Sequence, residues 1–175
     1  QPGDVELVAV TRGPGSFTGL RVGLATAKAL AYATGAAILG IDTLEAIAAN
    51  APDEVRQLAV AVDAQRGQII AGRFQRDSDQ RWTAVGPAEL LDVDAWLSSL
   101  EAGTHLSGPI LRRYVSRIPS HLVCLAPEFW PPRAAQVGRL AARDWAAGRR
   151  DDLWSLAPVY SRSSAAEEKW KQRGT

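Results

Sequence analysis

The chain has 175 residues, 46% of them hydrophobic, and a formal net charge of +1. That length and composition can bury a real core in one domain or two small lobes. The near-neutral charge gives no general attraction to nucleic acid or to a membrane, so tight RNA binding by this chain alone is disfavoured. The single cysteine, Cys124, excludes an internal disulfide and suits a reducing cytoplasm.

The first predicted elements alternate between strand and helix, as in an α/β fold. We expect a strand at 5–10, a helix at 19–34, a strand at 37–41 and a helix at 43–50. Pro52 and several charges follow, and they mark the best boundary between two lobes. The sequence therefore predicts one lobe at 1–50 and a second at 51–175.

The second lobe is predicted to begin with a β-hairpin, because two apolar runs flank the short polar segment Asp63 to Gly67. Pro131 and Pro132 introduce a last clear helix, and Gly148 ends it. In chain order we expect strands at 57–62, 68–75 and 82–85, a helix at 92–101, a strand at 104–107, a helix from 110 and the last helix at 133–147.

The most informative segment is TRGPGSFTGLRVG, residues 11–23, where a strand runs through a glycine-rich turn into a helix. Such a turn aims backbone N–H groups and the positive end of a helix at one point. It lacks the Lys-Ser or Lys-Thr pair of a Walker loop, and its third glycine is one position late for a Rossmann fingerprint. Two interpretations stay open, an anion site and a plain strand-to-helix turn. The candidate phosphate or nucleotide contacts are Gly13, Gly15, Ser16, Thr18, Gly19 and Asp63.

Asp63 ends an apolar strand, where its carboxylate either faces a ligand cleft or, as is more usual, caps a turn. Ser16 lies outside any G-x-S-x-G elbow, and no histidine is placed by sequence to activate it. His105 and His121 lack the H-x-x-x-H spacing that brings two imidazoles onto one metal ion. We therefore predict no catalytic residue and no metal site.

Four segments together resemble one family. TRGPGSFTGLRVG, GIDTLEA at 40–46, VDAQRG at 62–67 and APVYSR at 157–162 are similar to the motifs of TsaB, also called YeaZ, in the same order. This resemblance implies an actin-like (ribonuclease H-like) fold of two lobes. Members of the family normally begin with roughly sixty further residues that include the first phosphate loop. The chain starts at Gln1 and contains no methionine, so we expect the first strands of the amino-terminal lobe to be missing.

The helix at 19–34 is apolar nearly all round, since its only charged residues are Arg21 and Lys28. A helix of this kind is either a central helix covered by its own protein or one that a second subunit also covers. The resemblance favours the second interpretation, because TsaB-like proteins pair through this helix. The predicted contact residues are Leu20, Gly23, Leu24, Ala27, Lys28 and Ala31.

The function implied by the resemblance is that of a non-catalytic scaffold. Such a subunit dimerises with a TsaD-type transferase and, with a TsaE-type ATPase, serves the threonylcarbamoylation of adenosine 37 in tRNA. It would need no cofactor of its own, although ATP could bind in the complex, and homodimers and a cytoplasmic location are also implied. Two competing hypotheses are an ATP-binding actin-like phosphotransferase and a glycoprotease-like hydrolase.

Overall fold

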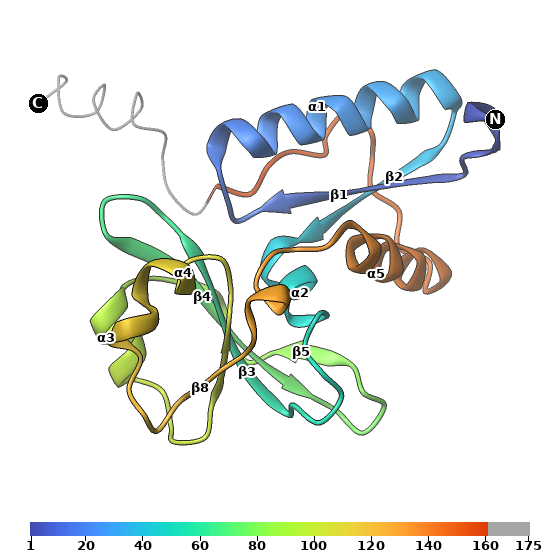
Figure 1. The fold of residues 1–175 in the computed structure, drawn as a ribbon. Helices are drawn as coiled ribbons and strands as arrows, with labels where there is room; N and C mark the ends of the chain where they lie inside the picture. Colours follow the sequence, from blue (N-terminus) through green and yellow to red (C-terminus); the bar gives the residue numbers. More distant parts are fainter. Residues whose placement is uncertain (161–175) are drawn as a thin grey trace, which may run out of the picture.

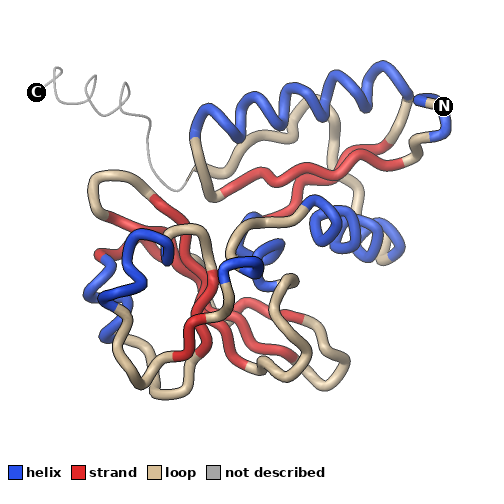
Figure 2. The backbone as a smooth tube through the Cα atoms, in the orientation of Figure 1, coloured by secondary structure: helices blue, strands red, loops and turns tan. Residues whose placement is uncertain are grey.

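The structure, a computed structural model, describes residues 1–160 and contains two β-sheets with helices packed around them (Figures 1 and 2). After the short turn η1 (Pro2–Asp4), strand β1 (Leu7–Gly13) runs parallel to β2 (Ala37–Asp42). Helix α1 (Phe17–Thr34) connects them as the crossover of a β-α-β unit.

This first sheet lies between two helices (Figure 1). Alternate side chains of β1 face opposite sides, so Val8 packs with α1 while Leu7 packs towards α5 (Ala134–Ala146). Helix α5 buries Val137, Leu140 and Ala141 there. The first sheet is therefore covered on both faces, as a parallel pair of strands requires.

The second sheet has six strands and a mixed topology. Its centre is the predicted hairpin, which the structure confirms as antiparallel, with β7 parallel to β3 and β8 parallel to β7. Strands β5 and β6 both pair with β4. The strands are β3 (Gln57–Asp63), β4 (Gln68–Arg76), β5 (Trp82–Ala84), β6 (Glu89–Asp92), β7 (His105–Ser107) and β8 (Val123–Cys124).

Both faces of the second sheet are buried. Ala59 and Ala61 of β3 face a cluster that contains α3 (Val93–Ser98) and the start of α4 (Leu111–Tyr114). Leu58, Val60 and Val62 face the opposite way, towards α2 (Thr43–Ala48). Two short turns, η2 (Val115–Arg117) and η3 (Pro127–Phe129), complete the lobe.

Helix α2 joins the two cores, because Leu44 packs on the second sheet while Ala46 packs with α5. Its first residues are held by Asp42, whose Oδ1 accepts hydrogen bonds from the N–H groups of Leu44 and Glu45, at 2.7 and 3.0 Å. This is an ordinary side-chain N-cap. Glu45, at the spacing of a capping box, pairs instead with Arg143 of α5 at 2.9 Å.

Asp42 gives a pH-dependent prediction. Burial raises the pKa of its carboxyl, although hydrogen bonds from Glu45 and Leu44 and the charge of Arg12 oppose the shift. The folded state therefore holds this proton more tightly, and the resulting stability is present at low pH and lost as pH rises through the folded pKa. Asp42→Asn keeps a good N-cap without the charge. In urea unfolding, its stability relative to wild type should be higher at pH 7 than below pH 4; a pH-independent difference would contradict the assignment.

Three sequence expectations need correction. Strands β6 and β8 were not predicted as strands, and the expected helix at 92–101 is reduced to Val93–Ser98. The proposed lobe at 51–175 also does not hold as one unit. Helix α5 packs on the first sheet, so the chain enters the second lobe after α2 and returns before residue 134.

Candidate functional site

The glycine-rich turn is shaped by contacts on both sides. Ser16 is the N-cap of α1 and accepts a hydrogen bond from the N–H of Gly19 at 3.3 Å. Gly13 has a φ of +125°, and a Cβ there would lie 2.4 Å from the carbonyl oxygen of Val159. Residue 13 is therefore a glycine because the main chain at Val159 passes directly over it and leaves no room for a side chain.

A cavity of about 440 Å³ lies between the two lobes, next to this turn. That volume is in the range of small-molecule sites. Most of its walls are apolar. The residues that line it are Thr11, Pro14, Gly15, Ser16, Gly19, Leu20, Gly23, Thr43, Val62, Asp63, Gln65, Pro109, Ile110, Arg113 and Pro132.

The cavity brings together four of the six candidate phosphate contacts, namely Gly15, Ser16, Gly19 and Asp63. Gly13 and Thr18 are not among its lining residues. Asp63 also makes the turn that the sequence allowed, because its Oδ1 accepts from the N–H of Gln65 at 2.8 Å. Asp63 thus caps this turn and also lines the cavity.

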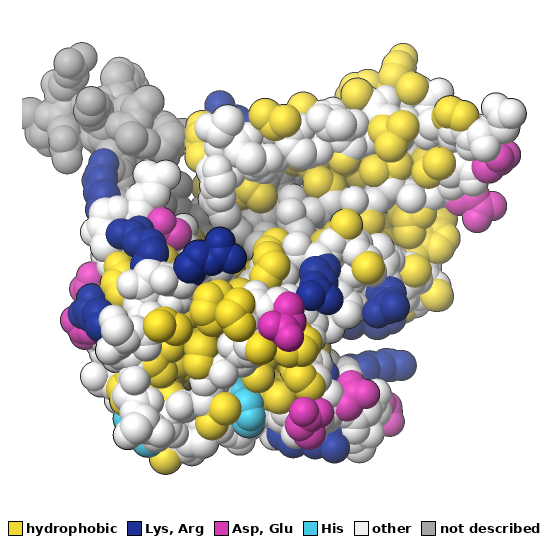
Figure 3. Space-filling view, in the orientation of Figure 1, with side chains coloured by type: hydrophobic (Ala, Val, Ile, Leu, Met, Phe, Trp, Pro, Cys, Tyr) yellow, Lys and Arg dark blue, Asp and Glu magenta, His cyan; other side chains and the backbone are white. Residues whose placement is uncertain are grey.

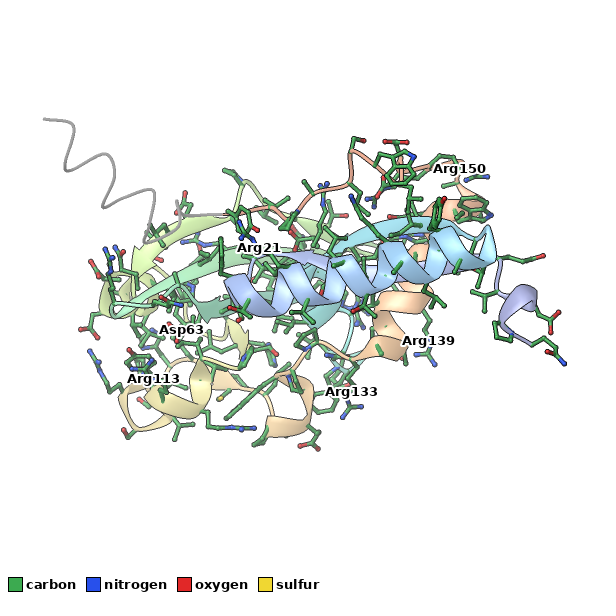
Figure 4. The ribbon with its side chains drawn as sticks, turned by 90° about the horizontal axis from the view of Figure 1, so that it is seen from above. Arg21, Asp63, Arg113, Arg133, Arg139 and Arg150 are labelled. Atoms are coloured by element: carbon green, nitrogen blue, oxygen red, sulfur yellow. The ribbon has the colours of Figure 1, made fainter. Side chains whose placement is uncertain are left out.

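Sequence reasoning missed Arg113, which lies 3.3 Å from the Oδ2 of Asp63. Figure 4 shows the two residues beside the start of α1. They are fifty positions apart, and the parallel pairing of β3 with β7 brings α4, which contains Arg113, to the end of β3. Because Arg113 already pairs with a carboxylate, its charge is only partly available to an anion in the cavity.

Ser16 lines the cavity, and its Oγ accepts a hydrogen bond from the N–H of Gly19 in its own helix. Neither His105 nor His121 is among the residues that line the cavity. Within residues 1–160, no group of three or more His, Cys, Asp or Glu side chains is placed to hold a metal ion. No helix among these residues is long and apolar enough to cross a membrane.

Helix α1 has two different sides, and this revises the predicted contact surface. Leu20, Leu24, Ala27 and Ala31 are at most 8% exposed, and the last three pack in the core of their own lobe. Lys28 is turned aside, donating from Nζ to the carbonyl oxygen of Trp154 at 3.0 Å. The sequence could not separate these sides, because alanine and larger apolar residues occur on both.

The opposite side is exposed to solvent, and the charged residue at its edge, Arg21, is bound to the hydroxyl of Tyr160. We call this side the outer face of α1. Val22 is 61% exposed and Leu30 44%, and they lie on one helix among exposed alanines, so the exposed apolar area is continuous rather than scattered. In Figure 3 the surface over α1 is mainly hydrophobic or uncharged. The outer face consists of Thr18, Val22, Ala25, Thr26, Ala29, Leu30 and Ala33.

Arginines near the end of α5 form hydrogen bonds and ion pairs that stabilise the fold. The hydrogen bonds of Arg143 to Asp144 and Glu45 outweigh its partial burial and raise the pKa of its guanidinium. Arg149 donates to the carbonyl oxygen of Gly40 at 2.6 Å and pairs with Asp144 and Asp151. By contrast, Arg139 has only a long contact with Gln136, at 3.5 Å. Figure 4 shows Arg133 and Arg139 on the side of α1 where Arg113 lies, and Arg150 on the other.

Two lobes around a cleft, with a glycine-rich strand-to-helix turn at its edge, define the class: an actin-like α/β protein. YeaZ from Pseudomonas aeruginosa superimposes with a TM-score of 0.78 at 27% identity, over 91% of this chain and 76% of that one. A family model described as "TsaD: tRNA N6-adenosine threonylcarbamoyltransferase" matches residues 1–106.

Curated relatives agree with this match. The tRNA threonylcarbamoyladenosine biosynthesis protein TsaB of Bacillus subtilis is 27% identical over 97% of this chain and 75% of its own length. An uncharacterized protein of Mycobacterium tuberculosis is 34% identical over 94% of this chain and 67% of its own length. The chain belongs to the TsaD/TsaB family, in its TsaB (YeaZ) branch.

Proposed function

We propose that this chain is a non-catalytic subunit in the biosynthesis of N6-threonylcarbamoyladenosine at position 37 of tRNA. Relatives that match nearly the whole chain are named tRNA threonylcarbamoyladenosine biosynthesis proteins, which supports the proposal. In the proposed assembly a TsaD-type transferase binds this chain, a TsaE-type ATPase joins them, and tRNA is bound through the complex.

The single observation that carries the proposal is the outer face of α1. An exposed, uncharged helical face rich in alanine allows another helix to approach closely and excludes water from the contact. Burial of Val22 and Leu30 in such a contact would remove apolar surface from water and so favour association. A partner that covers this face would hold its own active lobe in a fixed orientation.

The test is the mass of the complex. The full-length protein should be mixed with the TsaD-type protein of the same organism, and the mixture measured by size-exclusion chromatography with light scattering. We expect a heterodimer at low micromolar concentration. Two separate monomer peaks, or a homodimer that the TsaD-type protein does not dissociate, would contradict the proposal.

Calorimetry with ATP and Mg²⁺ separates the scaffold from the competing ATP-handling enzyme. Among the described residues that line the inter-lobe cavity, Arg113 is the one cationic side chain, and Asp63 partly neutralises it. We therefore expect no tight binding and no ATP hydrolysis by this chain alone. Turnover of ATP that Asp63→Asn abolishes would instead favour a phosphotransferase.

A further inference from the structure

The carboxy-terminal end of the described chain is fixed along one flank of α1. We call residues 151–160 the strap. The N–H of Val159 donates to the carbonyl oxygen of Arg12 at 2.7 Å, and Arg21 of α1 donates to the hydroxyl of Tyr160 at 2.9 Å. Leu156, 7% exposed, packs into the core of the first lobe. Side chains of the strap that point outward are therefore held in place.

One of these outward side chains, Trp154, contacts a large aromatic residue of α1, Tyr32. Trp154 of the strap is 74% exposed and Tyr32 of α1 is 70% exposed, the highest values among the large hydrophobic residues at 1–160. Their ring centroids are 5.7 Å apart with an interplanar angle of 63°, an edge-to-face geometry. Most tryptophans in folded proteins are largely buried, so an exposed one held by a fixed backbone needs an explanation.

The aromatic pair continues the outer face of α1. Tyr32 follows Ala29 by three positions, which places the two side chains next to each other on the helix. Lys28, the nearest cation on α1, is bound to the carbonyl oxygen of Trp154. The outer face and the pair thus adjoin each other, with the alanines on the helix and the two aromatic rings at its carboxy-terminal end.

We propose that the TsaD-type partner binds the outer face of α1 and the aromatic pair, and that Tyr32 and Trp154 are the anchor residues of this contact. This inference rests on the proposed function and adds the residues that hold the contact. Tryptophan and tyrosine are enriched among residues that dominate binding energy, since they bury large areas while losing few rotatable bonds.

The choice of partner follows from the match to the TsaD family model. That match covers residues 1–106, so a TsaD-type protein carries a counterpart of the lobe that contains α1. Two related helices can then pack by nearly equivalent faces. Trp154 lies outside the matched residues, so the strap adds to the contact a feature beyond the shared lobe. The strap would therefore favour the pairing of α1 with one partner over its pairing with other, similar helices.

The experiment measures the dissociation constant of the complex with the full-length TsaD-type protein. Trp154→Ala and Tyr32→Ala should each weaken binding by about 30-fold, the effect of a typical anchor residue. Trp154→Phe should retain most of the affinity. Val115→Ala, at an exposed residue of the second lobe, is the control and should change nothing. The unfolding midpoints should remain those of wild type, because both rings are largely in water.

The outcomes separate the two proposals. If wild type forms no complex, the proposed function fails. If wild type binds, and a charge on the outer face abolishes binding, but Trp154→Ala and Tyr32→Ala bind within twofold of wild type, only the anchor assignment fails. Loss of tRNA binding by the assembled complex, with unchanged affinity between the subunits, would also overturn it and indicate base stacking on Trp154 instead.

Discussion

Ala29→Glu should abolish the complex with the TsaD-type protein, raising the dissociation constant by more than about 100-fold, because burial of an unpaired charge costs several kcal/mol. Ala29 is exposed at the middle of the outer face of α1, so the free protein should accept the new carboxylate. Titration calorimetry or light scattering with the full-length partner would measure the loss. Circular dichroism should show an unchanged helix content.

The matched control is Ala142→Glu. Ala142 is also an exposed helical alanine, but it lies on α5 beneath the first sheet. The same chemical change there should leave binding within twofold. Ala27 would be an unsuitable site, since it is 7% exposed and packed in the core, where a glutamate would unfold the lobe. If the two glutamate variants bound the partner equally well, the outer face of α1 would not be the contact.

Gly108→Ala should lower the free energy of unfolding by at least about 3 kcal/mol, because backbone strain and overpacking act together. Gly108 has a φ of +125°, and a Cβ there would lie 2.0 Å from the carbonyl oxygen of Ala61. The carbonyl oxygen belongs to the main chain of β3, so it cannot move away without displacing that strand. Denaturation by urea would measure the change.

Gly138→Ala provides the contrast. Gly138 lies within α5, and a Cβ there would meet no atom within 4 Å. The alanine should therefore stabilise the protein by about 0.5–1 kcal/mol, the usual difference between these residues inside a helix. If Gly108→Ala were as harmless as Gly138→Ala, the close approach of residue 108 to β3 would be incorrect.

Local patterns predicted the elements that are long or sharply punctuated. The hairpin of β3 and β4 and the helix α1 follow from apolar runs and glycine signals, and the structure confirms them. Strands β6 and β8 have only four and two residues, too short for an alternating pattern. The return of α5 to the first sheet depends on contacts across a hundred residues, such as Arg143 with Glu45, which no local pattern reveals.

Only one part of the candidate site, the glycine-rich turn, was predictable from the sequence. The glycine-rich turn is visible in the sequence because its spacing is distinctive, whereas Arg113 is one arginine among many until the fold places it beside Asp63. The apolar character of α1 was also visible. Its exposed side was not, since helical periodicity distinguishes two sides only when their residue types differ.

The return of α5 and the strap to the first sheet has a consequence for synthesis. Leu39 and Ile41 are fully buried, and their cover includes Val137 and Leu140, which leave the ribosome about a hundred residues later. The second lobe, by contrast, is drawn largely from one continuous stretch. The later-made lobe can thus fold first on the nascent chain, while the apolar faces of β1 and β2 that α5 covers stay exposed until α5 has been synthesised.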